Sequence, residues 1–424
     1  MSEKRQRLFA ALRVPNFRLY FAGQAVSLTG TWMQSVAQSW LVLELSGSGT
    51  VLGLVIAAQF LPVLLAGPYG GLIADRSDKR RLLLFTQSAL ATLALLLGLL
   101  TVTHLVRLWM VVVFALALGT VNAVDNPTRQ TFVPEVVGKD LLGNAVSLNS
   151  VLVNTARAVG PAVAGLLIAG VGVGMCFLAN AVSFVAVLFA LVRMRVDRLH
   201  PARPVPSRPG QLAEGLRYVR GTAGLWVPLT MMALVGTLAY EFQVVLPLFA
   251  RVAMHGDART YGFLTAAMGA GAVAGGLAVA ARGRAGVLPL VIGATGFGLA
   301  LGVATVAPSL PAELAALALV GVGSTAFLAT GNTTLQLITR PSFRGRVMAL
   351  WSVTFLGSTP IGGPIVGVVA QFFGPRAGLG LGAAACLAAA VLGLCVLPRI
   401  PGPQRLIPRP VAPEVPPVTE SDRS

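Results

Sequence analysis

The chain has 424 residues, of which 55% are hydrophobic and only 11% are charged, whereas a soluble domain usually carries about 25% charged residues. This composition excludes an ordinary water-soluble enzyme or binding domain. The formal net charge of +17 does not indicate nucleic-acid binding, because the basic residues gather in alternate loops and form no single face.

Apolar blocks of about twenty residues follow one another from residue 17 to residue 398, separated by short loops. One example is LLLFTQSALATLALLLGLLTV at 82–102. A helix rising about 1.5 Å per residue needs roughly 20 apolar residues to cross a hydrocarbon core of about 30 Å. The blocks do not alternate apolar and polar residues, which argues against a barrel. The sequence therefore predicts an all-α membrane protein.

Twelve spans are predicted, and the even number places both ends of the chain on one side of the membrane. The spans are expected at 17–43, 50–74, 82–103, 107–125, 142–168, 174–192, 224–249, 260–281, 287–307, 312–332, 347–372 and 377–397. The long loop between spans six and seven is basic and rich in proline, and its stretch AEGLRYV is typical of a short amphipathic helix.

The two halves of the chain repeat each other. GGLIADRSDKRRLLL at 70–84 lines up with GGLAVAARGRAGVLP at 275–289, and RAVGPAVAG at 157–165 lines up with PIGGPIVGV at 360–368. Parallel repeats are typical of transporters that rock two bundles about a midplane site. The predicted parts are an N-terminal six-helix bundle, a cytoplasmic linker, a C-terminal six-helix bundle and a disordered cytoplasmic tail, at 1–193, 194–221, 222–398 and 399–424.

The basic residues predict the orientation of the chain. With these spans, 27 of the 32 Lys and Arg residues fall in the amino terminus, alternate loops and the carboxyl tail. Four fall in the other loops, and Arg157 lies inside span five. Positive charge collects on the cytoplasmic side of membrane proteins. We therefore expect a multi-pass protein of the plasma (inner) membrane with both termini in the cytoplasm.

The loop GGLIADRSDKRR between spans two and three resembles the signature loop of the major facilitator superfamily. The matching residues are Gly71, Asp75, Arg76, Lys79 and Arg80. An acid in place of the second glycine of that pattern, together with DNPTRQTFVPEVV, resembles the drug:proton antiporter branch that contains macrolide-efflux pumps and the enterobactin exporter. The resemblance covers almost the whole chain. It implies a fold of twelve transmembrane helices in two parallel six-helix bundles.

In this family the signature loop controls the opening of the transporter on its cytoplasmic side. The resemblance implies that Asp75 latches the two halves together when the outer mouth is open, and the start of span eleven, after Arg344 and Arg346, is the natural partner. The alternative is a tight basic turn that only fixes the topology of the chain. We expect Asp75→Asn to weaken transport while membrane insertion stays intact.

Span five carries a second signature. Antiporters of the family have the pattern G-x-x-x-G-P-x-x-G-G there, and this chain has Ala156, Gly160, Pro161, Ala164 and Gly165. Two glycines have become alanines, so the side chains stay small while the pattern is imperfect. The resemblance implies an exporter.

Three ionisable residues inside or at the end of spans are candidates for proton coupling. Glu241 in span seven is the first, because a carboxyl within a span can take up a proton on one side and release it on the other. The alternative places Glu241 at the outer mouth or in a fixed ion pair. Arg157 is either a charge in a wet cavity or a structural arginine beside Pro161. Asp125, with Arg129, ends span four as a proton relay or as a plain pair at the inner mouth.

Span one supplies candidate cavity residues. Gln34 and Gln38 are four residues apart and share a helix face, close to Trp32. First helices line the central cavity in the family. The two glutamines are therefore expected to hydrogen-bond a polar substrate, and Trp32 is expected to offer apolar area to it. The alternative is packing between helices with an interfacial aromatic.

The function favoured by these residues is proton-coupled export of an amphipathic small molecule such as a drug or siderophore. An uptake permease or facilitator, and a non-transporting membrane scaffold, remain as alternatives. We find no phosphate-binding loop, no catalytic residues and no metal-ligand cluster, and we expect no cofactor. The partners expected are the substrate, protons and the lipid bilayer, and family members mostly work as monomers.

Overall fold

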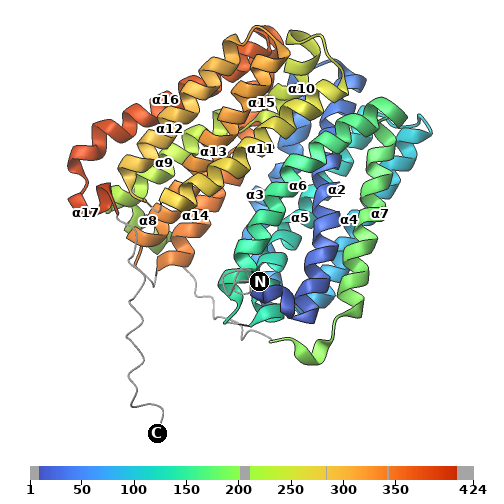
Figure 1. Cartoon of the computed structure of the whole chain (residues 1–424), viewed down its shortest axis with the longest axis horizontal. Helices are drawn as coiled ribbons and strands as arrows, with labels where there is room; N and C mark the ends of the chain where they lie inside the picture. The colour runs from blue at the N-terminus through green and yellow to red at the C-terminus, as the bar shows by residue number, and fades with distance from the viewer. Residues whose placement is uncertain (1–8, 139, 201–210, 283, 341–342, 408–424) are drawn as a thin grey trace.

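A computed structural model describes residues 9–138, 140–200, 211–282, 284–340 and 343–407 of the chain. Long helices make up almost all of these ranges, and they form two bundles that stand side by side (Figure 1). The predicted all-α fold in two parallel six-helix bundles is confirmed.

The N-terminal bundle consists of six long helices after a short 3-10 turn, η1 (Ala10–Arg13). These helices are α2 (Pro15–Ser46), α3 (Gly49–Arg76), α4 (Lys79–Val102), α5 (Leu108–Val137), α6 (Leu142–Val171) and α7 (Val173–Arg193). The turn after α2 needs glycine, because Gly47 adopts a positive φ of 63°. Asp78 caps the start of α4 by accepting a hydrogen bond from the Arg81 amide at 2.9 Å.

The C-terminal bundle repeats this arrangement with two of its rods broken. After η2 (Val196–Arg198) and the predicted loop helix α8 (Gln211–Arg220), the bundle comprises α9 (Ala223–Leu238), α10 (Phe242–Leu248), the π-helical segment η3 (Phe249–Ala253), α11 (Ala258–Arg282), α12 (Val287–Val306), α13 (Leu310–Ile338), α14 (Arg344–Leu356), α15 (Thr359–Phe372) and α16 (Pro375–Val396).

The break in span eleven has a local cause. Span eleven stops at Gly357 and restarts at Thr359, and Pro360 stands in the first turn of α15. Proline has no N–H and disfavours a helical residue before it, so the chain begins a new helix there. Span seven is interrupted between Leu238 and Phe242, which puts Glu241 at the start of α10 instead of inside a continuous helix.

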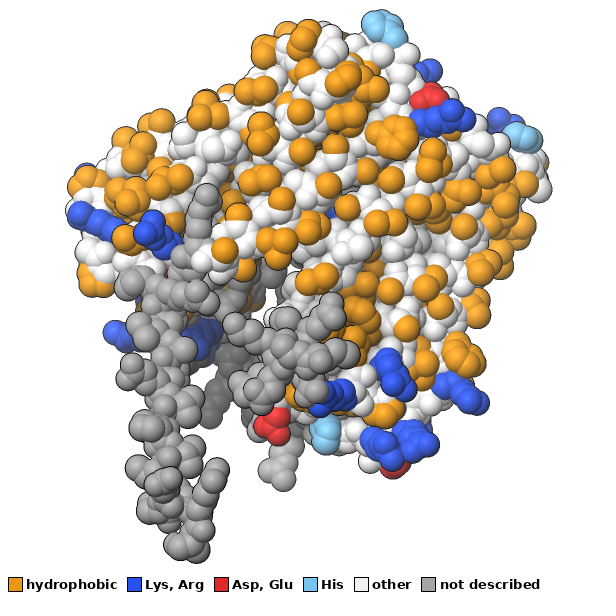
Figure 2. Space-filling model, viewed as in Figure 1, with side chains coloured by type: hydrophobic (Ala, Val, Ile, Leu, Met, Phe, Trp, Pro, Cys, Tyr) orange, Lys and Arg blue, Asp and Glu red, His pale blue; other side chains and the backbone are white. Residues whose placement is uncertain are grey.

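Eleven helical rods in the described part of the chain are long and apolar enough to cross a membrane. The first rod, α2, has 32 residues but is more polar, because it buries three glutamines: Gln24, Gln34 and Gln38. Polar side chains of this kind in a spanning helix face the protein interior. Figure 2 shows hydrophobic side chains spread over the flanks of both bundles, where lipid would surround them.

The repeat seen in the sequence is also a repeat of contacts. The second helix of each half packs on the fourth, as α3 on α5 and α11 on α13, and the third packs on the sixth, as α4 on α7 and α12 on α16. The bundles meet through α6 with α11 and through α15 with α3, which are again equivalent pairs. The structure therefore has the internal two-fold relation that the sequence repeat predicted.

The start of the predicted tail is folded, which corrects the expectation of disorder from residue 399. η5 (Leu397–Arg399) and α17 (Gly402–Arg405) follow α16, and Ile407 pairs with Ala285 through backbone hydrogen bonds. Arg405 donates from Nε to the Ile400 carbonyl at 2.7 Å, which closes the turn. Residues 408–424 lie outside the described ranges.

Candidate functional site

The two ends of the molecule differ in charge and in how closely the bundles approach. The basic end is the end at which α2 begins and α7 ends, and it carries Arg13, Lys79, Arg193 and Arg344. The opposite end, at which α2 ends at Ser46, is called the far end. Figure 1 shows the bundles meeting toward the far end and diverging toward the basic end.

Two glycine-lined seams join the bundles in the far half. In the first, α3 packs against α15, and a Cβ placed on Gly367 would lie 2.5 Å from the carbonyl oxygen of Gly49. Gly53 and Gly363 approach each other in the same way one turn further along. Glycine is required where two backbones come this close.

The second seam joins α6 to α11 and uses the predicted antiporter signature. A Cβ on Gly262 would lie 2.6 Å from the Pro161 carbonyl and 2.8 Å from the Gly165 Cα. Gly160 instead packs on α2, because a Cβ there would lie 2.7 Å from the Cβ of Trp32. Ala156 is buried in the same helix. The small residues of span five therefore fit α6 between α2 and α11.

Between the bundles, in the half nearer the basic end, lies a cavity of about 630 Å³, called the larger cavity. Its lining comes from α2, α3, α5 and α6, with one residue, Gln243, from α10. Seven of the lining side chains are carboxamides: Gln24, Gln59, Asn122, Asn126, Gln130, Asn149 and Gln243. Trp32, Phe60, Val63 and Val153 add apolar area. The cavity therefore suits a ligand with both polar and apolar parts.

A smaller cavity of about 60 Å³ adjoins it inside the N-terminal bundle. The predicted cavity residues Gln34 and Gln38 line this smaller cavity, while Trp32 lines the larger one. Gln38 donates to the side-chain oxygen of Gln59 at 2.8 Å, and Asn180 donates to that of Gln34 at 2.6 Å. Hydrogen bonds between helices thus fix the polar wall that the two cavities share.

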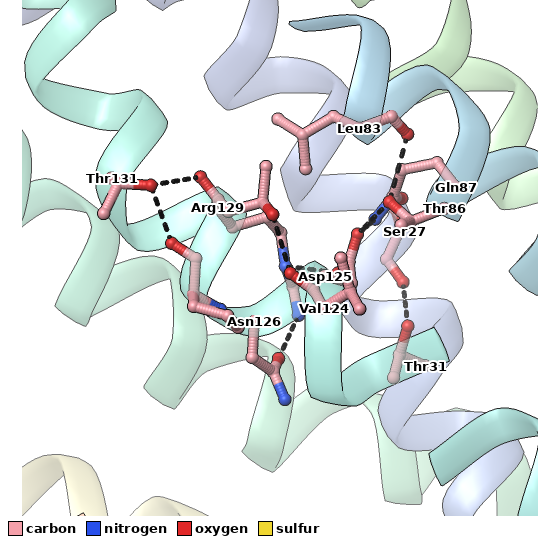
Figure 3. A network of polar contacts seen from close by, with 12 residues as sticks. Ser27, Thr31, Leu83, Thr86, Gln87, Val124, Asp125, Asn126, Arg129 and Thr131 are labelled. Atoms are coloured by element: carbon pink, nitrogen blue, oxygen red, sulfur yellow. Dashed lines mark hydrogen bonds and ion pairs between the residues drawn. The ribbon is translucent and has the colours of Figure 1, made fainter. Parts of the chain in front are cut away.

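The charged centre of the N-terminal bundle is the pair formed by Asp125 and Arg129 (Figure 3). One oxygen of Asp125 accepts hydrogen bonds from the Thr86 hydroxyl at 2.6 Å and the Gln87 amide at 2.8 Å. The other lies 2.8 Å from Nε of Arg129, whose Nη2 donates to Asn126 at 2.9 Å. The Asp125 side chain is 0% exposed and that of Arg129 is 25% exposed. A buried charge needs this degree of compensation.

The position of this pair corrects the sequence prediction. Span four was expected to end at residue 125, which placed Asp125 at the inner mouth. In the structure α5 continues to Val137, with Pro127 and Pro134 inside the helix. Asn126, Arg129 and Gln130 are polar because they line the larger cavity, and their polarity does not mark the membrane edge. Asp125 and Arg129 are thus one helical turn apart and lie in the bundle interior.

The described part of the chain thus has twelve long rods in two repeated bundles, with a polar cavity in its interior. The model of the transmembrane secretion effectors matches residues 6–416. The chain belongs to this family of the major facilitator superfamily. It is a transporter and not an enzyme.

Two curated relatives and one solved structure illustrate the likeness. The transporter is 26% identical over 372 residues to the staphyloferrin A transporter of Staphylococcus aureus, covering 84% of this chain and 90% of the relative. It is 24% identical over 361 residues to macrolide efflux protein A of Streptococcus pyogenes, covering 82% and 87%. A crystal structure of a D-xylose-proton symporter has a TM-score of 0.68 at 13% identity, covering 90% of this chain and 97% of that chain. The macrolide-efflux branch predicted from the motifs is confirmed.

In this transporter the signature loop makes its polar contacts within the N-terminal bundle. Lys79 forms a buried ion pair with Glu135 of α5 at 2.6 Å. Arg80 donates from Nε to the Leu191 carbonyl at 2.7 Å and so binds the end of α7. Asp75 and Arg76 are exposed, and within the described ranges Asp75 forms no ion pair with α14.

The predicted partners of Asp75 are engaged elsewhere. Arg346 pairs with Glu214 of α8 at 2.7 Å, and Arg344 donates to the Gln336 carbonyl at 3.2 Å. Gly71, the glycine matched to the motif, has open space around its Cβ position, whereas Gly70 packs on the Ala123 carbonyl of α5. The tight helix contact thus belongs to the neighbouring glycine.

Glu241 lies outside both cavities, in the C-terminal bundle. Its side chain is buried, with the residue 3% exposed, and Oε1 has no hydrogen-bond partner in the described part of the chain. A Cβ on Gly362 would lie 2.8 Å from this oxygen, so the carboxylate contacts the first turn of α15. The N-terminus of a helix favours negative charge. Glu241 therefore adjoins the helix that forms the first seam.

Arg157 also lies outside the lining of both cavities. Its guanidinium carbon lies 5.4 Å from the centre of the Trp32 ring, and its Nε has no hydrogen-bond partner in the described ranges. No ion pair joins it to Glu241 there. Arg157 therefore packs behind the Trp32 wall through a cation–π contact.

Two buried acids, Glu135 and Glu313, were not predicted from the sequence. Glu135 lies in the part of α5 that was predicted to be a loop. Glu313 is 0% exposed in the first turn of α13 and was not among the ionisable candidates predicted from the sequence. Glu313 lay one residue inside a predicted span edge, which made it look interfacial. The equivalent helix of the N-terminal bundle, α5, begins at Leu108 and has no acid in its first turn, so the sequence repeat did not point to Glu313 either.

Proposed function

We propose that the chain is a secondary active transporter that exports amphipathic small molecules, of the siderophore or drug type, by alternating access and in exchange for protons. The relatives support the substrate types, since one is named a staphyloferrin A transporter and another a macrolide efflux protein. The single observation that carries the proposal is the larger cavity of about 630 Å³ in the half nearer the basic end, together with the close glycine seams that join the bundles in the far half.

The proposal places the basic end in the cytoplasm, in accord with the positive-inside pattern of the loops. The larger cavity then faces the cytoplasm and takes up its cargo from that side. Residues 1–193 and 222–398 are the two moving units, 194–221 is the linker between them, and 399–424 is a cytoplasmic tail. The transporter works as a monomer in the plasma (inner) membrane, with protons, substrate and lipid as its partners.

Glu241 is the proposed proton carrier. Two features favour it over Asp125. Asp125 accepts hydrogen bonds from Thr86 and Gln87 and forms an ion pair with Arg129. Among the described residues, Oε1 of Glu241 has no hydrogen-bond partner and Glu241 forms no ion pair. Glu241 also contacts the first turn of α15, so a change in its charge acts on a seam helix.

The test uses purified protein in liposomes with an imposed pH gradient. Wild type should drive substrate toward the compartment facing the far end when protons flow the other way. Glu241→Gln should abolish gradient-driven transport and retain exchange of substrate for substrate, because exchange needs no change in the carboxyl. Glu44→Gln, an exposed acid at the far end of α2, is the matched control and should couple like wild type.

The outcomes separate the parts of the proposal. Full coupling in the Glu241→Gln variant would remove Glu241 as the proton carrier and leave the exporter intact. Movement of substrate in the direction of the proton flux would indicate an uptake permease. Wild-type protein that moves no member of a panel of siderophores and drugs would contradict a transport function of this kind.

A further inference from the structure

The lining of the larger cavity carries a positive charge and no negative one among the described residues, and this bears on which molecules the transporter carries. Among the described residues that line it, Arg129 is the only charged side chain, and no carboxylate is present. The remaining polar lining consists of carboxamides and hydroxyls. A cation entering this cavity would meet one positive charge and no negative one, whereas an anion would meet a ready partner.

The nearest acid does not cancel this difference. Asp125 lines only the smaller cavity and is 0% exposed, and both of its oxygens are occupied by Thr86, Gln87 and Arg129. Arg129 lines both cavities and is 25% exposed. Its Nε faces Asp125 and its Nη2 donates to Asn126, while within the described ranges Nη1 has no hydrogen-bond partner. The acid orients the guanidinium, and the free N–H groups of Nη1 remain for a ligand.

A second donor lines the same cavity without a partner. Gln24 of α2 is 3% exposed, and its side-chain nitrogen has no hydrogen-bond partner in the described part of the chain. A buried amide N–H that bonds nothing is costly unless a ligand or water accepts its hydrogen bond. Two unpartnered donors, one of them cationic, therefore line one cavity.

We propose that Arg129 and Gln24 form an anion-binding subsite of the larger cavity, which takes a carboxylate of the transported molecule. The proposal rests on the transport function proposed above and narrows its substrate to amphipathic carboxylates, as opposed to cationic amphipaths. The carboxylate accepts hydrogen bonds from the Arg129 guanidinium and the Gln24 amide. Trp32 and Phe60 cover the apolar part of the same molecule.

Two fluorescent probes that share a ring system and differ in charge test this subsite. Dansylglycine carries a carboxylate and dansylcadaverine carries an amine, and the binding of each to purified protein is followed by the rise in dansyl fluorescence. Wild type should bind dansylglycine at least tenfold more tightly than dansylcadaverine. Arg129 is removed together with its partner, as Asp125→Asn with Arg129→Gln, so that no unpaired charge stays buried. This double variant should bind dansylglycine about tenfold to a hundredfold more weakly.

The controls distinguish the loss of a specific contact in the subsite from misfolding and from the loss of any positive charge. Gln24→Leu should weaken dansylglycine binding by about fivefold, because one neutral hydrogen bond is lost. Arg259→Gln removes an exposed arginine that lines neither cavity and should bind dansylglycine like wild type. Monodisperse elution in size-exclusion chromatography establishes that each variant is folded.

The result that overturns the subsite is equal dansylglycine affinity in wild type and a folded double variant. Tighter binding of dansylcadaverine than of dansylglycine by wild type, or binding of neither probe, overturns it as well. Each of these results leaves the export proposal standing if liposomes still show proton-driven transport of another substrate. Loss of all transport in wild-type liposomes contradicts the export proposal whatever the probes show.

Discussion

The guanidinium of Arg251 donates a hydrogen bond from Nη1 to the carbonyl oxygen of Leu43 at 3.0 Å and so ties the C-terminal bundle to the last turn of α2. A second cross-bundle bond lies beside it, because the Gly49 amide at the start of α3 donates to Gln371 of α15 at 2.6 Å. The turn between α2 and α3 is thus held on both sides by side chains of the other bundle. Under the proposed alternating access, both bonds break when the far end opens.

Arg251→Ala should shift the transporter toward a state that is open at the far end. A hydrogen bond from a charged donor contributes about 1.5–3 kcal/mol, and a loss of that size changes the ratio of two states by about tenfold or more. Spin labels at Glu44 and Val252, both exposed, report the distance between the bundles at this end. The variant should gain a population with longer distances.

Arg259→Ala is the control for this change. Arg259 is an exposed arginine at the same end, and in the described ranges its side chain makes no hydrogen bond or ion pair across the seam. Its distance distribution should match that of the parent protein. Identical distributions for Arg251→Ala and Arg259→Ala would show that the bond to Leu43 does not hold the far end closed.

Gly53→Ala should disrupt the seam between α3 and α15. The added methyl group would overlap the Gly363 carbonyl, so the helices must separate, and such overpacking costs about 1–3 kcal/mol. We expect a lower melting temperature in detergent and slower transport. Gly67→Ala in the same helix is the matched control, because nothing lies within 4 Å of a Cβ at that position. Equal melting temperatures for the two variants would argue against a close seam.

The buried ion pair of Lys79 and Glu135 should show strong coupling. Replacing Lys79 by Met removes this buried ion pair and should lower the melting temperature. Adding Glu135→Gln should cost less in the Lys79→Met background than in wild type, and melting curves of the two single variants and the double variant measure this difference. Arg81→Ala removes the exposed pair with Asp78 and should change stability by less than about 1 kcal/mol. Additive losses of melting temperature from the two single changes would contradict the coupling.

Asp75→Asn should weaken transport without lowering stability. In the described state Asp75 is exposed and forms no ion pair within the described ranges. The substitution by Asn should therefore leave the stability of this state unchanged. The proposed latch acts only when the basic end closes, and its loss should slow the cycle. Transport rates and melting temperatures measured on the same preparations check both statements. Unchanged transport would leave the loop as a topological turn.

The fold was predictable from the sequence because crossing a bilayer imposes a simple rule on composition. Eleven rods obey it, and α2 was predicted as the first span at 17–43 although it is more polar. The rule fails where polar residues line a cavity inside the membrane. For this reason α5 was predicted to end at residue 125 although it continues past Pro127 to Val137.

The site was less predictable because it depends on which helix faces meet. Gln34, Gln38 and Trp32 do lie on cavity walls, yet nothing in the local sequence indicated that Arg129 would line both cavities. Glu241 was singled out as a carboxyl within a span, but its contact with α15 joins segments more than a hundred residues apart in the sequence.

The glycine seams have a consequence for how this protein evolves and for how it is engineered. Where Gly49 and Gly53 meet Gly363 and Gly367, the two surfaces consist of backbone atoms, so one helix can slide along its neighbour without any rotamer having to rearrange. Such an interface permits sliding but tolerates no substitution, because even the methyl group of alanine would overlap the backbone of the neighbouring helix. Sequence variation that tunes cargo choice should therefore accumulate on the cavity walls and leave these positions alone.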